Sequence, residues 1–134
     1  MIEAPTLWRL VEARAQATPD ARFAIDEQER SLSFAELHDE ALRAAAGLHT
    51  RGIGVDTPVS WLLPTRLSAF VLMAALARLG AVQNPLVPIY REREIRFCLE
   101  QTGARFLLVP ETFRGFDFGP LARTLAEESE ALTA

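Results

Sequence analysis

Residues 58–86 read PVSWLLPTRLSAFVLMAALARLGAVQNPL, and this stretch decides the fold. Its first part, 59–63, is short, apolar and bounded by prolines, which is typical of a buried strand. The apolar spacing predicts a helix over 67–79 that ends at Gly80, because glycine adopts the left-handed conformation without steric cost. A second strand over 81–86 follows directly. A strand, a helix and a strand in this order predict a parallel βαβ unit.

The chain beyond this stretch continues the same alternation. The pattern predicts a helix over 91–102 that ends at Gly103, a buried strand over 105–109, and a fifth helix that starts at Pro120. We therefore predict an α/β fold with a parallel sheet and helices on both faces, in which 58–126 form one βαβαβα unit. A fourth parallel strand would be expected after the last helix, which indicates a partial subdomain.

The residues before this stretch predict a helix and a short hairpin. Thr6 caps a helix that runs to Ala17, and segments 23–26 and 31–32 form the two arms of the hairpin. The serine and glutamate of the segment 33–36 fit a capping box, which starts a second amphipathic helix. These elements form an entry region, 6–52, that precedes the βαβ repeat.

Composition limits what the chain can do. It has 134 residues and no lysine, so all 14 basic side chains are arginine, and 18 acidic residues bring the net charge to −4. This length and a hydrophobic content of 49% predict one domain, 1–134, with a packed core. The acidic balance argues against a nucleic-acid partner. The longest apolar run, 69–77, is far shorter than the ~20 residues that a transmembrane helix needs.

Other features of the composition indicate where the protein is found. Cys98 is the single cysteine and cannot form an internal disulfide, so we predict a cytoplasmic location. Arginine without lysine, in an alanine-rich chain, suggests a bacterial genome rich in GC.

No residue is predicted to be catalytic, cofactor-binding or metal-binding. The absence of lysine excludes a Walker-type phosphate lysine and a Schiff-base lysine. The glycine pair in 52–54 precedes a strand instead of following one, so it fits a helix stop and a turn. His38 and His49 lie ~16 Å apart on one predicted helix, too far to share a metal ion, and are expected to face solvent. Cys98 is expected in the core.

Three further segments have a functional interpretation and a structural one. Residues 90–94 could grip an anion, or they form a solvated helix start with internal ion pairs. The phenylalanines of 113–118 could line an acyl pocket, or they pack as a loop against the sheet. The acidic segment 127–130 fits a solvated helix face. The structural interpretation is preferred in each case.

Several motifs together resemble the N-terminal part of the adenylate-forming enzymes, specifically the AMP-forming acyl-CoA synthetases. A TPDA segment precedes an LSFAEL core, and LARLGAVQNPL, PIYRERE, TGAR and FRGFDF follow in the family's order. These segments occupy Thr18–Ala21, Leu32–Leu37, Leu76–Leu86, Pro88–Glu94, Thr102–Arg105 and Phe113–Phe118. The asparagine-proline-leucine followed by YRERE is similar to the branch that activates fatty, alicyclic or steroid side-chain acids.

The resemblance implies a two-step reaction for the complete family enzyme. A carboxylate and ATP form an acyl-adenylate, and coenzyme A then displaces AMP, so ATP, Mg²⁺, coenzyme A and a carboxylic acid are the implied cofactors and substrates. The family's phosphate loop, ribose aspartate and C-terminal lysine have no counterpart in this chain. The resemblance therefore implies an N-terminal segment that is inactive alone, with no cofactor site of its own and with the remainder of the ligase as its partner.

Two alternatives from other classes remain open. The chain could be a non-catalytic interaction module, for example one component of a split enzyme. It could also be a free-standing flavodoxin-like nucleotide-binding domain, although no glycine-rich loop follows a strand. The helix over 67–79 is apolar on most faces, so we also predict an exposed apolar patch that binds hydrophobic dyes.

Overall fold

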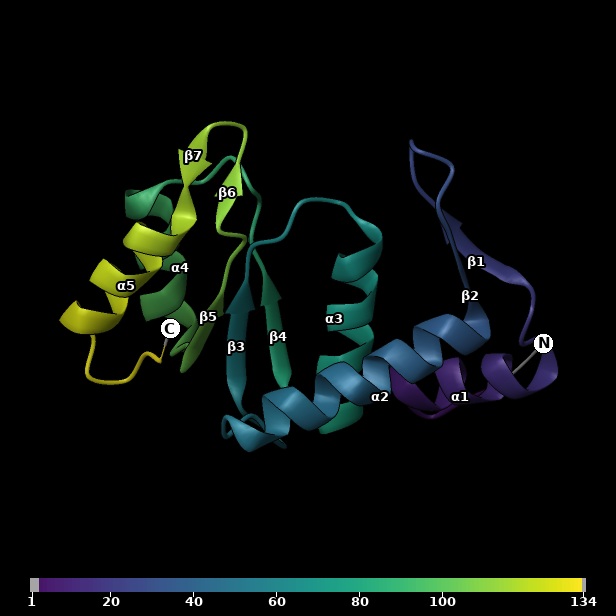
Figure 1. Ribbon diagram of the computed structural model, residues 1–134. Coiled ribbons are helices and arrows are strands. Elements are labelled where there is room, and N and C mark those ends of the chain that lie inside the picture. The colour runs from purple at the N-terminus through teal and green to yellow at the C-terminus, as the bar shows by residue number, and fades with distance from the viewer. Residues whose placement is uncertain (1–2, 134) are drawn as a thin grey trace. The chain divides into compact units, whose positions relative to one another are not determined.

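The computed structural model describes residues 3–133, which divide into two compact units (Figure 1). Unit 1 contains the chain up to Val55 together with Thr65–Ala81. Unit 2 contains Asp56–Pro64 and the chain from Val82 onward. Residues 1, 2 and 134 of the predicted domain lie outside the described residues.

Unit 1 is a helical unit with one hairpin. Its helices begin and end close to the predicted bounds, and the two arms of the hairpin pair antiparallel as expected. The third helix lies between two strands of unit 2 in the sequence, yet it clusters with unit 1. In chain order the elements are α1 (Leu7–Ala17), β1 (Arg22–Ile25), β2 (Ser31–Ser33), α2 (Phe34–Thr50) and α3 (Leu67–Leu79).

Local hydrogen bonds start the first two helices of unit 1. The Thr6 hydroxyl accepts from the Arg9 N–H at 3.2 Å. At the start of α2, the Ser33 Oγ accepts from the Glu36 N–H at 3.1 Å, while the Glu36 carboxylate accepts from the Ser33 N–H at 2.7 Å. This reciprocal pair confirms the predicted capping box. The hydrogen bond from the Ser33 backbone holds the pKa of Glu36 below its ordinary value.

Small side chains let the helices of unit 1 pack closely. Ala41 and Ala75 are fully buried, and Ala74 is nearly so. Trp8 is the largest buried side chain of this core, and its ring stacks on His38 with 5.3 Å between centroids. The core is one cluster that also contains Val11, Leu32, Leu37, Ala45 and Val71.

Unit 2 is built on a three-stranded parallel sheet, which confirms the predicted α/β class. The strand order is β4-β3-β5, and both pairs of neighbours are parallel. Helices flank the sheet, and a small antiparallel hairpin interrupts the chain before the last helix. The elements are β3 (Pro58–Trp61), β4 (Val82–Pro85), α4 (Glu92–Thr102), β5 (Phe106–Leu108), β6 (Thr112–Phe113), β7 (Phe116–Asp117) and α5 (Phe118–Glu128).

The core of unit 2 lies between one face of this sheet and the helices α4 and α5, which run side by side in Figure 1. Leu62 from the end of β3 and Ile95 from α4 are fully buried, and Phe118 from α5 is 1% exposed. Leu62 points to the same face as Ser60, because alternate residues of a strand share a face. Leu107 of β5 is the partner of Ser60, so Leu62 and Leu107 both lie in this core.

Two details of unit 2 differ from the expectations. The fifth helix starts at Phe118 and not at Pro120, because the N–H groups of Phe118 and Gly119 donate to the Glu111 carbonyl at 2.9 and 3.4 Å. The phenylalanine-rich segment before it is the β6–β7 hairpin and not an irregular loop.

The last described residue, Thr133, lies beside the sheet where the sequence led us to expect a further parallel strand. It forms an isolated parallel bridge to Phe106 of β5. Its N–H donates to the Arg105 carbonyl at 2.7 Å, and the Leu107 N–H donates to its carbonyl at 3.4 Å.

Candidate functional site

The carboxyl ends of the strands are where an open α/β sheet places its ligands. Because β3, β4 and β5 are parallel, these ends meet at one edge of the sheet in unit 2. The segments that follow the strands there are 62–64, 86–91 and 109–111. The β6–β7 hairpin leaves the sheet at the same edge, directly after β5. This edge is the candidate site.

Polar side chains near this edge are already satisfied by one another. Ser60 is fully buried, and its hydroxyl accepts from the Asn84 amide at 3.1 Å. The Trp61 indole donates to Gln83 Oε1 at 3.3 Å. Both pairs join β3 to β4 and give the sheet its register, so they act as structural contacts and not as ligand groups.

Residues 91–94 are exposed at the start of α4, which agrees with the preferred interpretation of the segment 90–94 as a solvated helix start with ion pairs. Glu92 does pair with Arg96 at 2.8 Å, and Arg96 also reaches Glu128 at 2.6 Å. Arg91, however, directs its guanidinium at backbone carbonyls and at the ring of Phe116. Sequence reasoning missed this role, since nothing local marks which aromatic ring a distant arginine will meet.

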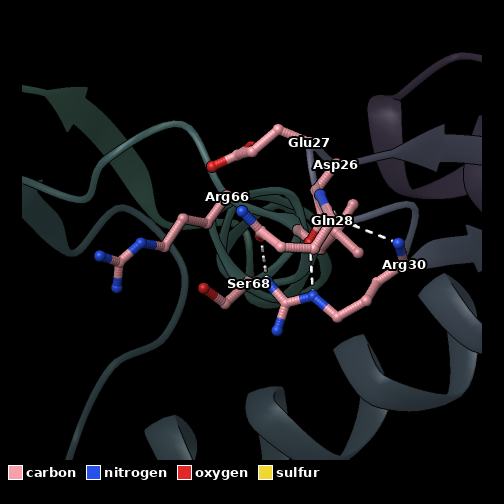
Figure 2. A pocket seen from close by; sticks show the side chains of 7 residues that line it. Asp26, Glu27, Gln28, Arg30, Arg66 and Ser68 are labelled. Carbon is pink, nitrogen blue, oxygen red and sulfur yellow. Dashed lines mark hydrogen bonds and ion pairs between the residues drawn. The ribbon is translucent and has the colours of Figure 1, made fainter.

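Unit 1 contains a hollow of about 550 Å³ (Figure 2). It is lined by the turn between β1 and β2 and by the start of α3. The Asp26 carboxylate accepts from the N–H groups of Gln28 and Arg30 at 3.0 and 2.9 Å, and from the Arg30 guanidinium at 2.6 Å. Arg30 also donates to the Gln28 amide oxygen at 3.2 Å.

These bonds explain the electrostatics of the hollow. Desolvation opposes ionisation of Asp26, but the hydrogen bonds from Arg30 and Gln28 outweigh it and keep the pKa of Asp26 below its ordinary value. Figure 2 shows the Arg66 side chain extending away from the Asp26–Arg30 pair. The acid and the base of this turn stabilise each other, so the turn holds its own shape without a ligand.

The individually considered residues do not converge on a site. His49 is exposed as expected, but His38 is only 26% exposed because it stacks on Trp8 and contacts Asp39. Cys98 is half-buried and borders a hollow of about 650 Å³ with Tyr90 and the 62%-exposed Phe97. Within residues 3–133 no three histidine, cysteine or acidic side chains gather as metal ligands.

The groups that adenylate formation requires find no matching residues in this chain. There is no lysine to neutralise a phosphate, and no glycine-rich loop follows β3, β4 or β5. Over the described part of the chain, the carboxylates are not clustered in a way that would hold Mg²⁺.

The family model for AMP-binding enzymes matches residues 11–133. The chain belongs to the AMP-binding enzyme family. Its parallel sheet and the order of its motifs fit that membership, and the resemblance to the adenylate-forming enzymes is confirmed.

Several curated proteins of the AMP-binding family are similar in sequence. The salicyl-AMP ligase / salicyl-S-ArCP synthetase of Mycobacterium tuberculosis is 34% identical over 131 residues, covering 95% of this chain and 23% of that protein. A mitochondrial medium-chain acyl-CoA ligase of Macaca fascicularis is 26% identical, covering 93% of this chain and 20% of that protein. Bacitracin synthase 2 of Bacillus licheniformis is 31% identical, covering 81% of this chain and 4% of that protein. The chain thus spans less than a quarter of each of these relatives.

Solved structures agree with the fold of this AMP-binding family member. The Mycobacterium tuberculosis fatty acyl CoA synthetase has a TM-score of 0.78 at 20% identity, covering 95% of this chain and 24% of that one. The Klebsiella oxytoca NpsA N-terminal subdomain has a TM-score of 0.76 at 21% identity, covering 96% and 35%. At these identities the likeness concerns the fold alone. Among the described residues, no helix combines the length and the apolar character required to cross a bilayer.

Proposed function

We propose that this chain is the N-terminal part of an ATP-dependent, AMP-forming carboxylic acid–CoA ligase. In the complete enzyme a carboxylate attacks the α-phosphorus of ATP and releases pyrophosphate, and the coenzyme A thiol then displaces AMP from the acyl-adenylate. The acid is proposed to be a fatty, alicyclic or steroid side-chain acid. The cytoplasmic location and bacterial source inferred from the sequence belong to the same proposal.

The observation that carries the proposal is the family match over residues 11–133. An acyl-CoA ligase and an acyl-adenylate ligase are among the relatives that this stretch resembles along most of its length. The motif of residues 84–94 supports the fatty, alicyclic or steroid branch.

The chain alone is proposed to be inactive. Lysine is absent, and no glycine-rich loop follows a strand, so the chain lacks two of the groups that the family resemblance implies for ATP chemistry. Purified chain should give no carboxylate-dependent exchange of pyrophosphate into ATP. Exchange above the background of a boiled sample would contradict this part of the proposal.

Chimeric enzymes test the proposed role directly. In each chimera, this chain would replace the corresponding N-terminal segment of a host enzyme. The two hosts are the Mycobacterium tuberculosis fatty acyl CoA synthetase and the salicyl-AMP ligase. We expect acid-dependent exchange in both hosts, with more of the parent rate retained in the fatty acyl host. Folded chimeras that are inactive in both hosts would overturn the role, and a clear preference for the salicyl host would overturn the acid class.

One component of a split enzyme is the second candidate function, and the outer edge of β5 is where a partner polypeptide would extend the sheet. Thr133 pairs with the outer edge of β5, so this edge of the sheet accepts a further parallel strand. In a split enzyme, that strand and the phosphate loop would come from a separate polypeptide. Co-purification of a ligase fragment that carries the phosphate loop would support this candidate, and separate purification of the two would argue against it.

A further inference from the structure

Arg91 ties together the loop that leaves β4. Its guanidinium Nη1 donates to three successive carbonyls, those of Pro88 at 3.3 Å, Ile89 at 3.0 Å and Tyr90 at 2.9 Å. The loop is also closed by the Tyr90 N–H, which donates to the Val87 carbonyl at 3.0 Å. A single side chain therefore satisfies the exposed carbonyls of this loop at the carboxyl end of β4.

The same guanidinium also reaches the segment that leaves β5. Its central carbon lies 4.3 Å from the ring centre of Phe116 and 5.6 Å from that of Phe118. The two rings contact each other edge-to-face at 4.7 Å, and Phe118 is anchored in the core of unit 2. An arginine over an aromatic face is attracted by the ring quadrupole.

The hydrogen bonds at the hairpin base and at the start of α4 each act within one of the two segments. The hairpin is closed at its base by the Glu111 carbonyl, which accepts from the Phe118 and Gly119 N–H groups. The Glu94 carboxylate accepts from the Arg91 backbone N–H at 3.2 Å. The Arg91 guanidinium contacts the carbonyls and rings described above. Arg91 takes part in none of the ion pairs found among residues 3–133.

We propose that Arg91 is a positioning residue that couples the loop 86–90 and the β6–β7 hairpin into one rim at the carboxyl edge of the sheet. This extends the proposed function and rests on it, because a substrate that approaches this edge of the ligase meets both segments in a fixed arrangement. The guanidinium matters as well as the charge, since its Nη1 contacts three carbonyls while its central carbon lies over two rings.

Hydrogen–deuterium exchange on the chain itself tests the coupling. In Arg91→Ala we expect exchange at Tyr90 and across 112–118 to become about tenfold faster or more, because both segments lose their shared contact. Amides of the β3–β5 ladder should keep their protection, which separates a local effect from general unfolding. Arg93→Ala is the matched control, since Arg93 is an exposed arginine on the same helix start.

Two further variants make the test specific. Phe116→Ala, made in the hairpin, should speed exchange at Tyr90 in the other segment if Arg91 couples them. Arg91→Lys keeps the charge without the planar guanidinium that lies over the two rings, and should restore less than half of the lost protection.

Exchange in Arg91→Ala equal to that in Arg93→Ala, an unchanged Tyr90 in Phe116→Ala, or full restoration by lysine would each overturn the proposal. No acid or nucleotide is present in these measurements. A result against the coupling by Arg91 can therefore be distinguished from a result against the ligase role.

Discussion

The two units of this chain are stabilised in different ways. Unit 1 relies on contacts between near neighbours in sequence, such as the Ser33–Glu36 box, and on alanines that let three helices approach. Unit 2 relies on strands that meet from distant positions, since Val59 pairs with Gln83 on one side and with Phe106 on the other. The difference teaches that packing between helices dominates one part of this family segment, and that pairing between distant strands dominates the other.

Two tryptophans allow the units to be followed separately, because Trp8 lies in unit 1 and Trp61 in unit 2. A Trp61→Phe background reports on unit 1 and a Trp8→Phe background on unit 2. Urea unfolding of each background, read by fluorescence, supplies the measurement for the predictions that follow.

The largest effect is expected from Phe118→Ala in unit 2. Phe118 is 1% exposed at the centre of this core, and removing a buried phenylalanine side chain costs about 3–5 kcal/mol. The Trp61 transition should move to lower urea, and the Trp8 transition should move much less. Phe97→Ala is the control, since Phe97 is 62% exposed. Equal shifts at both tryptophans would break the comparison and show that the units unfold as one.

The stability of unit 1 should be most sensitive to enlarging a buried side chain. Ala41 is fully buried where the helices meet, and inserting a larger side chain there should cost about 1–3 kcal/mol through overpacking. Ala41→Leu should therefore shift the Trp8 transition, whereas Ala46→Leu on the exposed side of α2 should not. A neutral Ala41→Leu would mean that the helices are free to separate.

One glycine in each unit ends a helix in the left-handed conformation, and these two positions sharpen the comparison. Gly80 has φ 71° and Gly103 has φ 60°, so alanine at either position should cost about 1–2 kcal/mol. Gly80→Ala should cost more, because a Cβ there would lie 3.3 Å from Val55 Cγ2, while the space around Gly103 is open. Gly47→Ala, inside α2, is the control and should stabilise by about 0.5–1 kcal/mol.

The outcome of the sequence analysis depends on how far apart in the sequence the contacting residues lie, and not on the unit that contains them. The bounds of α1 and α3 and the capping box of α2 were predictable, because each depends on residues within one or two turns of each other. The order of strands and helices was predictable from periodicity.

Features that depend on distant partners were not predictable. The clustering of α3 with unit 1 and the stacking of His38 on Trp8 each require a contact far along the chain. The start of α5 at Phe118 requires the Glu111 carbonyl, which lies across the β6–β7 hairpin. The candidate edge was predictable from the parallel topology. The role of Arg91 there was not, since its partners Phe116 and Phe118 come from beyond the next strand.

The smallest effect concerns one glutamate in the first turn of a helix in each unit. The Ser33 backbone N–H lowers the pKa of Glu36, and the Arg91 backbone N–H lowers the pKa of Glu94. A lowered folded-state pKa contributes stability that is fully present above the unfolded value, about 4.3, and is lost as the pH falls through the folded value. The urea midpoint should therefore fall less steeply as the pH is lowered in Glu36→Gln and in Glu94→Gln. The change should be seen at Trp8 in the first variant and at Trp61 in the second. The Glu36 carboxylate accepts from the Ser33 N–H at 2.7 Å, whereas the Glu94 carboxylate accepts from the Arg91 N–H at 3.2 Å, so Glu36→Gln should have the larger effect on the pH dependence. The reverse order would contradict this ranking of the two caps.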